Sequence, residues 1–161
     1  MTMSGGFGHL QKGHGVSFAD FDNDGDQDVY VQLGGAYPAD RNVDALFENP
    51  GSDQHSVTLK LEGTTSNRCA IGAKIRLQIT EDGATRSIYK DVTSGSSFGA
   101  NPLRQSVGSG NAAVIDTLEV YWPTSDTTQM FHHVASDQAY RIVEGKSELE
   151  SVKLVPFHRK K

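Results

Sequence analysis

Residues 20–28 of the chain read DFDNDGDQD, and this acidic stretch lies between two β-like segments, GVSFA before it and VYVQL after it. Aspartates occupy its positions 1, 3, 5, 7 and 9, and glycine occupies position 6. Carboxylates at this density repel one another unless a cation lies among them, and calcium accepts about six to eight oxygen ligands in flexible geometry. A glycine at position 6 permits a sharp turn because it adopts positive φ without strain. The pattern predicts a calcium-binding loop between two strands.

Five acidic residues of this loop are candidate calcium ligands, four through side chains and the one at position 7 through its main-chain carbonyl: Asp20, Asp22, Asp24, Asp28 and, by the carbonyl, Asp26. An EF-hand loop begins in the same way, but it needs a glutamate at position 12 and helices on both sides. Position 12 here is Val31, and both flanks are β-like. The alternative is an acidic surface turn without a metal, since Asp, Asn and Gly favour turns. Ordinary turns, however, do not place carboxylates at every second position.

Length and composition limit the class of protein. A chain of 161 residues is long enough for one domain, or one and a fraction, with a hydrophobic core. The formal net charge is -5, and the acidic loop alone supplies five aspartates, so the charge argues against a nucleic-acid partner. The single cysteine, Cys69, excludes an intramolecular disulfide. We expect no membrane span, because no apolar run approaches the roughly 20 residues required, and no signal peptide within this chain.

The rest of the sequence predicts an all-β fold, an antiparallel β-sandwich or barrel-like domain preceded by the strand–calcium-loop–strand unit. After a break at Pro50-Gly51, apolar and polar residues alternate with a period of two, which is typical of strands buried on one face. Residues 93–110 are rich in Gly and Ser and are expected to form a long loop, and at most a short helical turn is expected at 38–45. The expected strands after the break lie at 57–61, 75–79, 85–92, 118–122, 130–134, 140–143 and 152–155.

Three motifs resemble a known family. The segment GHGVSFADFDNDGDQDVYV resembles the last FG-GAP unit, the integrin-type calcium-loop repeat, of bacterial proteins in which an ASPIC/UnbV domain follows. SNRCAIGAKIRL and IDTLEVYWPTSDTTQMF resemble motifs of that ASPIC/UnbV domain, which also occurs in cartilage acidic protein. The resemblance implies an FG-GAP-like calcium unit at 1–50, a partial propeller blade, and an ASPIC/UnbV-like β domain at 51–145. A C-terminal strand and basic tail at 146–161 complete the expected division.

Two functional hypotheses follow. The first is a calcium-binding, non-catalytic β domain that acts as an adhesion, scaffold or protein-interaction module of a larger exported protein. An extracellular, periplasmic or cell-surface location is implied by the resemblance and by the abundance of calcium outside cells. The second is a carbohydrate-binding module that uses the 93–110 loop and aromatic side chains, with Phe98, Asn101 and Trp122 as candidate ligand contacts. The sequence shows no nucleophile–base or zinc motif typical of an enzyme, and Trp122 is expected in the core beside Leu118 and Val120.

Overall fold

Eleven β-strands form the regular structure of the residues that the computed structural model describes, which are 7–8, 12–35, 37–95 and 98–157. No helix occurs among these residues, and the expected all-β fold class is confirmed. The strands are β1 (Gly13–Ala19), β2 (Asp28–Leu33), β3 (Ala45–Phe47), β4 (His55–Glu62), β5 (Lys74–Glu81), β6 (Ala84–Asp91), β7 (Gln105–Gly110), β8 (Val114–Trp122), β9 (Thr127–Ala135), β10 (Gln138–Val143) and β11 (Glu150–Val152).

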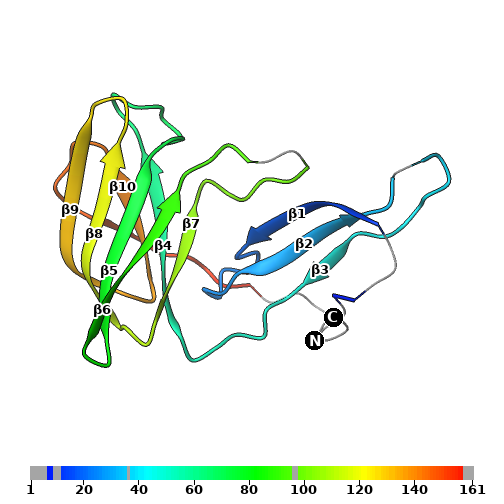
Figure 1. Cartoon of the computed structure of the whole chain (residues 1–161), viewed down its shortest axis with the longest axis horizontal. Coiled ribbons are helices and arrows are strands. Elements are labelled where there is room, and N and C mark those ends of the chain that lie inside the picture. The colour runs from blue at the N-terminus through cyan, green and yellow to red at the C-terminus, as the bar shows by residue number, and fades with distance from the viewer. Residues whose placement is uncertain (1–6, 9–11, 36, 96–97, 158–161) are drawn as a thin grey trace.

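Eight of these strands form a β-sandwich of two four-stranded sheets (Figure 1). One sheet has the order β11-β10-β4-β7, and the other has the order β6-β5-β8-β9. Neighbouring strands are antiparallel except β4 and β10, which run parallel with Val57 opposite Gln138. Parallel neighbours need a long connection, and here the chain builds β5 to β9 between them. The sandwich is therefore mixed rather than purely antiparallel.

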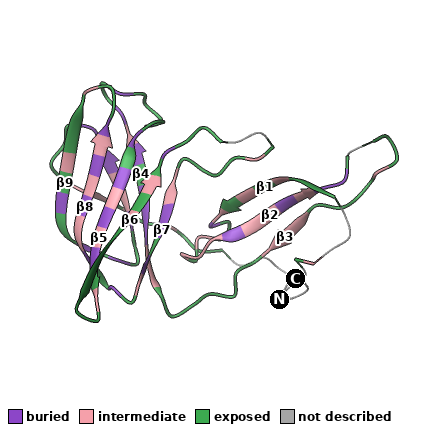
Figure 2. Ribbon diagram, in the orientation of Figure 1, coloured by how far each residue is buried: buried purple, intermediate pink, exposed green. Residues whose placement is uncertain are grey.

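The hydrophobic core lies between the two sheets and follows the period-two pattern of the sequence. Every second residue points inward in β4 from Val57 to Leu61, in β5, and in β8 from Leu118 to Trp122, whose exposed fraction is 0%. Figure 2 shows this alternation as purple bands along the sandwich strands. The inward residues of these three strands are Val57, Leu59, Leu61, Ile75, Leu77, Ile79, Ile115, Leu118, Val120 and Trp122.

The other three strands, β1 to β3, form a small antiparallel sheet beside the sandwich (Figure 1). Strands β1 and β2 pair as a hairpin, and their ladder closes where Ala19 lies opposite Asp28. The acidic stretch between these two residues is the connection of the hairpin. Strand β3 extends the sheet on the other side of β2, with Ala45 opposite Val31. The sheet thus fixes both ends of the predicted calcium loop.

The prediction of one long loop at 93–110 is wrong in its last third, because residues 105–110 form β7 and pair with β4. The small Gly and Ser side chains of residues 105–110 made this strand hard to recognise from the sequence, but they can be accommodated inside the protein. Ser109 is fully buried, and its hydroxyl donates to the Ala112 carbonyl over 3.0 Å, so its polar group is satisfied inside the protein.

Two smaller expectations concern short segments, and the second of them differs from the structure. Residues 38–45 contain a turn closed by a hydrogen bond from the N–H of Asp40 to the carbonyl of Tyr37 (3.0 Å), and no helical turn. The last strand lies at 150–152 rather than 152–155, because β11 pairs with β10 through Ser151 opposite Tyr140. None of the described residues forms a helix that is long and apolar enough to cross a membrane.

Candidate metal centre

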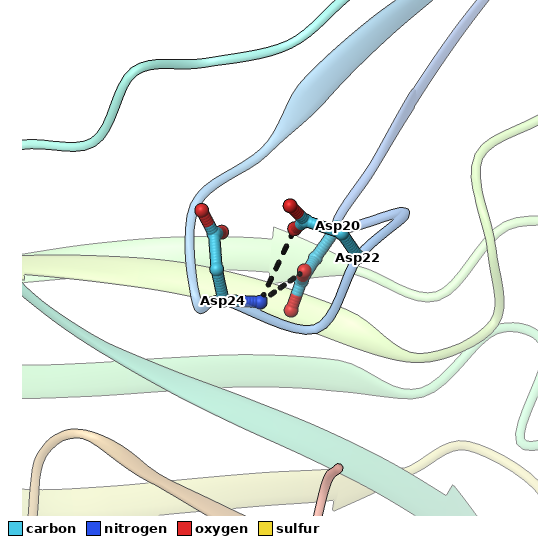
Figure 3. Close-up of side chains that lie close together, drawn as sticks. All are labelled: Asp20, Asp22 and Asp24. Atoms are coloured by element: carbon cyan, nitrogen blue, oxygen red, sulfur yellow. Dashed lines mark hydrogen bonds between the residues drawn. The ribbon is translucent and has the colours of Figure 1, made fainter. Parts of the chain in front are cut away.

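Three carboxylates of the acidic loop converge. Asp20, Asp22 and Asp24 each place a carboxylate oxygen within 4.8 Å of the others (Figure 3). The backbone N–H of Asp24 lies between its two neighbours and donates to Asp20 Oδ1 (3.1 Å) and to Asp22 Oδ1 (3.3 Å). Positive φ angles at Asn23 (60°) and Gly25 (102°) curl the chain around this centre. The loop therefore presents oxygen ligands to one point, as a hard cation requires.

Asp20 is the most deeply buried member of the cluster. The residue is 5% exposed, and its Oδ2 atom is buried without a hydrogen-bond partner among the described residues. Burial raises the pKa of the Asp20 carboxyl above its usual value, the Arg104 guanidinium lowers it, and the Asp24 carboxylate raises it again. The Arg104 guanidinium lies 3.8 Å from this oxygen, too far for a hydrogen bond. A buried carboxylate oxygen without a hydrogen bond is costly. A divalent cation among the three carboxylates would remove this cost, so the residues present fit a calcium ion.

The other two predicted ligands, Asp28 and Asp26, lie outside this cluster of three carboxylates. Asp28 is 3% exposed, and its carboxylate accepts the N–H of Phe21 (3.0 Å) and the N–H of Asn49 (2.8 Å). It thus ties the start of the loop to the segment that leaves β3. Each of its oxygens keeps a second lone pair, so a ligand role at position 9 is compatible with these bonds. Asp26 donates its N–H to Asp24 Oδ1 (2.9 Å), and neither Asp26 nor Asp28 belongs to the cluster of three.

Residues of the sandwich and of the C-terminal segment hold the loop from outside. Arg104, just before β7, donates to Asn23 Oδ1 and to the Asp20 carbonyl, both over 2.9 Å. Ser56 of β4 donates its hydroxyl to the Gly25 carbonyl (3.1 Å). Beyond β11, the N–H of Phe157 donates to the carbonyl of Asp22 (2.9 Å). Sequence reasoning missed Arg104 and Ser56, because no local pattern shows that they reach the loop.

The candidate ligand contacts of the carbohydrate hypothesis do not come together. Trp122 is buried, and its indole N–H donates to Gln129 Oε1, so the ring is not available to a ligand. Asn101 uses its side-chain oxygen to accept the N–H of Phe18 in β1 (2.9 Å). Phe98 is 72% exposed and lies edge-on near His14, with the ring centroids 6.5 Å apart. The 98–101 segment therefore lies along β1, away from Trp122.

A pocket of about 540 Å³ lies beside the acidic loop. Its floor is formed by Ser56 and Thr58 of β4 and by Ala139 of β10, while Asp24 and Asp26 line the side that the loop provides. This volume is in the range of small-molecule sites. The pocket shares its wall with the candidate metal centre, and the sequence did not predict it.

Comparison with known proteins gives one positive result. The family model described as ASPIC and UnbV matches residues 63–149. The matched range contains the two motifs SNRCAIGAKIRL and IDTLEVYWPTSDTTQMF, and it runs through the sandwich from the turn after β4 nearly to β11. The acidic loop lies outside it. A search of curated proteins gave no match.

Proposed function

This chain belongs to the ASPIC and UnbV family, and on that premise we propose that it is a calcium-binding, non-catalytic β module of a larger exported protein. The segment around the acidic loop acts as an FG-GAP-like unit, and the sandwich acts as the domain that follows it. The module serves adhesion, scaffolding or protein interaction at the cell surface, in the periplasm or outside the cell. Calcium is the partner for which the side chains give the most direct support.

One observation carries the proposal: the buried Oδ2 of Asp20, which has no hydrogen-bond partner among the described residues, lies within a cluster of three carboxylates. Asp20, Asp22 and Asp24 would hold the ion, and Asp28 with the Asp26 carbonyl would complete the expected ligand set. Bound calcium supplies positive charge that neutralises the repulsion among these groups. Calcium closed in by protein oxygens serves structure, which suits a module without catalysis.

The surroundings of the loop suggest what the ion stabilises. The loop belongs to the small sheet, yet its backbone is held by Arg104, Ser56 and Phe157, which come from the sandwich side of the chain. An ion that fixes the loop would therefore also fix the joint between the small sheet and the sandwich. Calcium is thus expected to act on the stability of the whole chain.

We expect calcium to raise the melting temperature. Free calcium at about 100 times its Kd adds about 2.7 kcal/mol to the free energy of unfolding, which corresponds to a shift of roughly 5–10 °C for a chain of this size. Magnesium should substitute poorly, because it demands tighter octahedral geometry and releases water reluctantly. The measurement is a melting curve with calcium, with magnesium and with chelator.

Variants make this test specific. Asp22→Ala and Asp24→Ala each delete a carboxylate of the cluster and should abolish most of the calcium shift. Gln27→Ala is the matched control, because this side chain belongs to the same loop and is outside the cluster. The proposal is wrong if chelator leaves the wild-type melting temperature unchanged and calorimetric titration shows no calcium binding.

Arg104→Lys tests whether Arg104, which directly precedes strand β7 of the sandwich, positions the acidic loop. Lysine keeps the positive charge near Asp20 but cannot reproduce the two bonds that the planar guanidinium makes to Asn23 and to the Asp20 carbonyl. The loss of about 1 kcal/mol from these bonds should weaken calcium binding about fivefold in calorimetry. Arg86→Lys, at an ion pair on the far sheet, is the control and should leave calcium affinity unchanged. Equal affinities in both variants would contradict the positioning role.

A further inference from the structure

The pocket beside the acidic loop is rich in hydrogen-bond acceptors. Four carboxylates line it, against the single lysine Lys153. Three of the four, Asp24 and Asp26 on the loop and Asp53 in the linker before β4, have no ion-pair partner among the described residues, and the fourth is paired with His55. The potential in such a pocket favours a positively charged ligand. The four carboxylates belong to Asp24, Asp26, Asp53 and Asp137.

His55 adds a further polar group to the pocket. Its Nδ1 lies 2.6 Å from Asp137 Oδ2, and Asp137 Oδ1 accepts the N–H of Ser56 (3.2 Å). These contacts fix the orientation of the Asp137 carboxylate and of the imidazole ring, and both residues line the pocket.

The floor of the pocket offers a further polar group. Thr58 is 5% exposed and lines the pocket. Its hydroxyl oxygen is not among the fully buried atoms without a partner, so it is accessible from the pocket. The Thr58 side chain lies on the face of β4 opposite Val57 and Leu59, so it does not belong to the hydrophobic core. Its hydroxyl is a group that a molecule in the pocket would contact.

We propose that this pocket binds a guanidinium group, in the first place the side chain of an arginine presented by a partner protein. A guanidinium is planar, always charged, and offers five N–H donors and no acceptor. It matches a pocket lined by the carboxylates of Asp26 and Asp53 and by the hydroxyl of Thr58. The inference deepens the proposed protein-interaction role, but it does not depend on calcium binding.

Other ligand classes fit less well. A sugar is usually held by stacking on an aromatic ring, and no Phe, Tyr or Trp is among the residues that line the pocket. A phosphate or carboxylate ligand would face the four carboxylates. A second metal ion would need three ligand atoms close together, and among the described residues that arrangement occurs only at Asp20, Asp22 and Asp24.

The test is a titration of the whole chain with short capped Gly/Ser peptides that carry one central arginine, citrulline or lysine, followed by NMR or calorimetry. We expect the arginine peptide to bind, with the amide signals of Ser56 and Thr58 shifting, and the neutral citrulline peptide not to bind. The lysine peptide should bind more weakly, because an ammonium cannot span acceptors on two walls. Agmatine, a small free guanidinium compound, is the fourth probe, and tighter binding of agmatine than of the peptide would assign the pocket to a small molecule.

Variants localise the binding. Asp53→Asn removes one pocket carboxylate outside the acidic loop and should weaken arginine-peptide binding about fivefold, as for an accessible ion pair. Asp91→Asn, an exposed carboxylate at the end of β6, is the matched control and should have no effect. Equal binding of the arginine and citrulline peptides, or binding unaffected by Asp53→Asn, would overturn the inference, and so would absence of binding by all four probes.

Calcium is measured separately in the same samples. Each titration is repeated with calcium and with chelator, and the melting curve reports calcium binding by itself. A calcium-dependent melting temperature without peptide binding would overturn the guanidinium site and leave the calcium proposal standing. Peptide binding without any calcium effect would support the pocket and contradict the calcium proposal.

Discussion

Replacement of Trp122 by alanine is expected to lower the free energy of unfolding by about 3–5 kcal/mol, the range for deletion of large aromatic side chains from a core. The ring is fully buried at the end of β8, and its neighbours on the same face of that strand, Leu118 and Val120, are fully buried as well. Removal of the ring leaves a cavity that the packed sheets cannot close. Urea unfolding measured by circular dichroism gives the value directly.

The indole N–H contributes a second part of this effect. It donates to Gln129 Oε1, and Gln129 Nε2 in turn donates to the carbonyls of Val143 (3.1 Å) and Lys146 (2.6 Å). Trp122 thus supports a side chain that joins β9 to the end of β10. Trp122→Phe keeps much of the ring volume and removes the donor. Gln129 Oε1 still accepts the N–H of Gly145 (3.2 Å), so the change should cost about 0.5–1.5 kcal/mol, the net contribution of one hydrogen bond.

Tyr121→Ala is the matched control. Tyr121 is the adjacent aromatic residue on the same strand, but it faces outward and donates its hydroxyl to Asp126 (3.0 Å). Its loss should cost less than half as much as the loss of Trp122. A Trp122→Ala protein as stable as the Tyr121→Ala protein would mean that the core does not depend on this ring. Glycan binding lost in Trp122→Ala without loss of stability would instead favour the carbohydrate hypothesis.

Strands buried on one face were predictable because alternation depends only on local sequence. The runs at 57–61 and 75–79 each place an apolar side chain at every second position, and both lie inside the observed strands. Strand β7 escaped prediction because Ser106, Gly108 and Ser109 carry no such signal, although the pairing with β4 holds them in a strand. The parallel pairing of β4 with β10 also could not be predicted from the sequence, because it depends on the path of the chain between these strands.

In the candidate metal centre, too, the local features were predictable from the sequence and the long-range contacts were not. The carboxylate spacing predicted the loop, and three of the five expected residues converge in the structure. Arg104, Ser56 and Phe157, which hold the loop, are far from it in the sequence. The pocket is likewise built from segments that are distant in sequence, so no motif could have shown it.

Glu144, directly after β10, is the second residue with a large expected effect. It is 5% exposed, and its Oε2 accepts the backbone N–H groups of Thr64 (2.7 Å), Thr65 (2.8 Å) and Ser66 (2.7 Å). Its Oε1 accepts the hydroxyls of Ser66 (2.8 Å) and Ser125 (2.6 Å). One carboxylate therefore joins the turn after β4 to the turn between β8 and β9.

The charge of Glu144 is stabilised in the folded state. Burial by itself would raise the pKa of this carboxyl, but the hydrogen bonds from Ser125, Ser66 and Thr64 outweigh it and lower the pKa to about 2 from 4.5. Since the folded pKa lies below the unfolded one, the contribution to stability is present above pH 4.5 and is lost as the pH falls toward 2. The difference between the two pKa values corresponds to about 3 kcal/mol at neutral pH.

Glu144→Gln is expected to remove this contribution, because the amide resembles the protonated acid in size and carries no charge. The variant should be less stable than the wild type by about 3 kcal/mol at pH 7, and the difference should shrink as the pH falls from 4.5 toward 2. Urea unfolding of both proteins at several pH values measures it, and subtraction cancels the other carboxylates. Glu148→Gln, at an exposed glutamate four residues further on, is the control and should stay within about 0.5 kcal/mol of the wild type at every pH. A difference between wild type and Glu144→Gln that does not change with pH would show that the charge of Glu144 does not stabilise the fold.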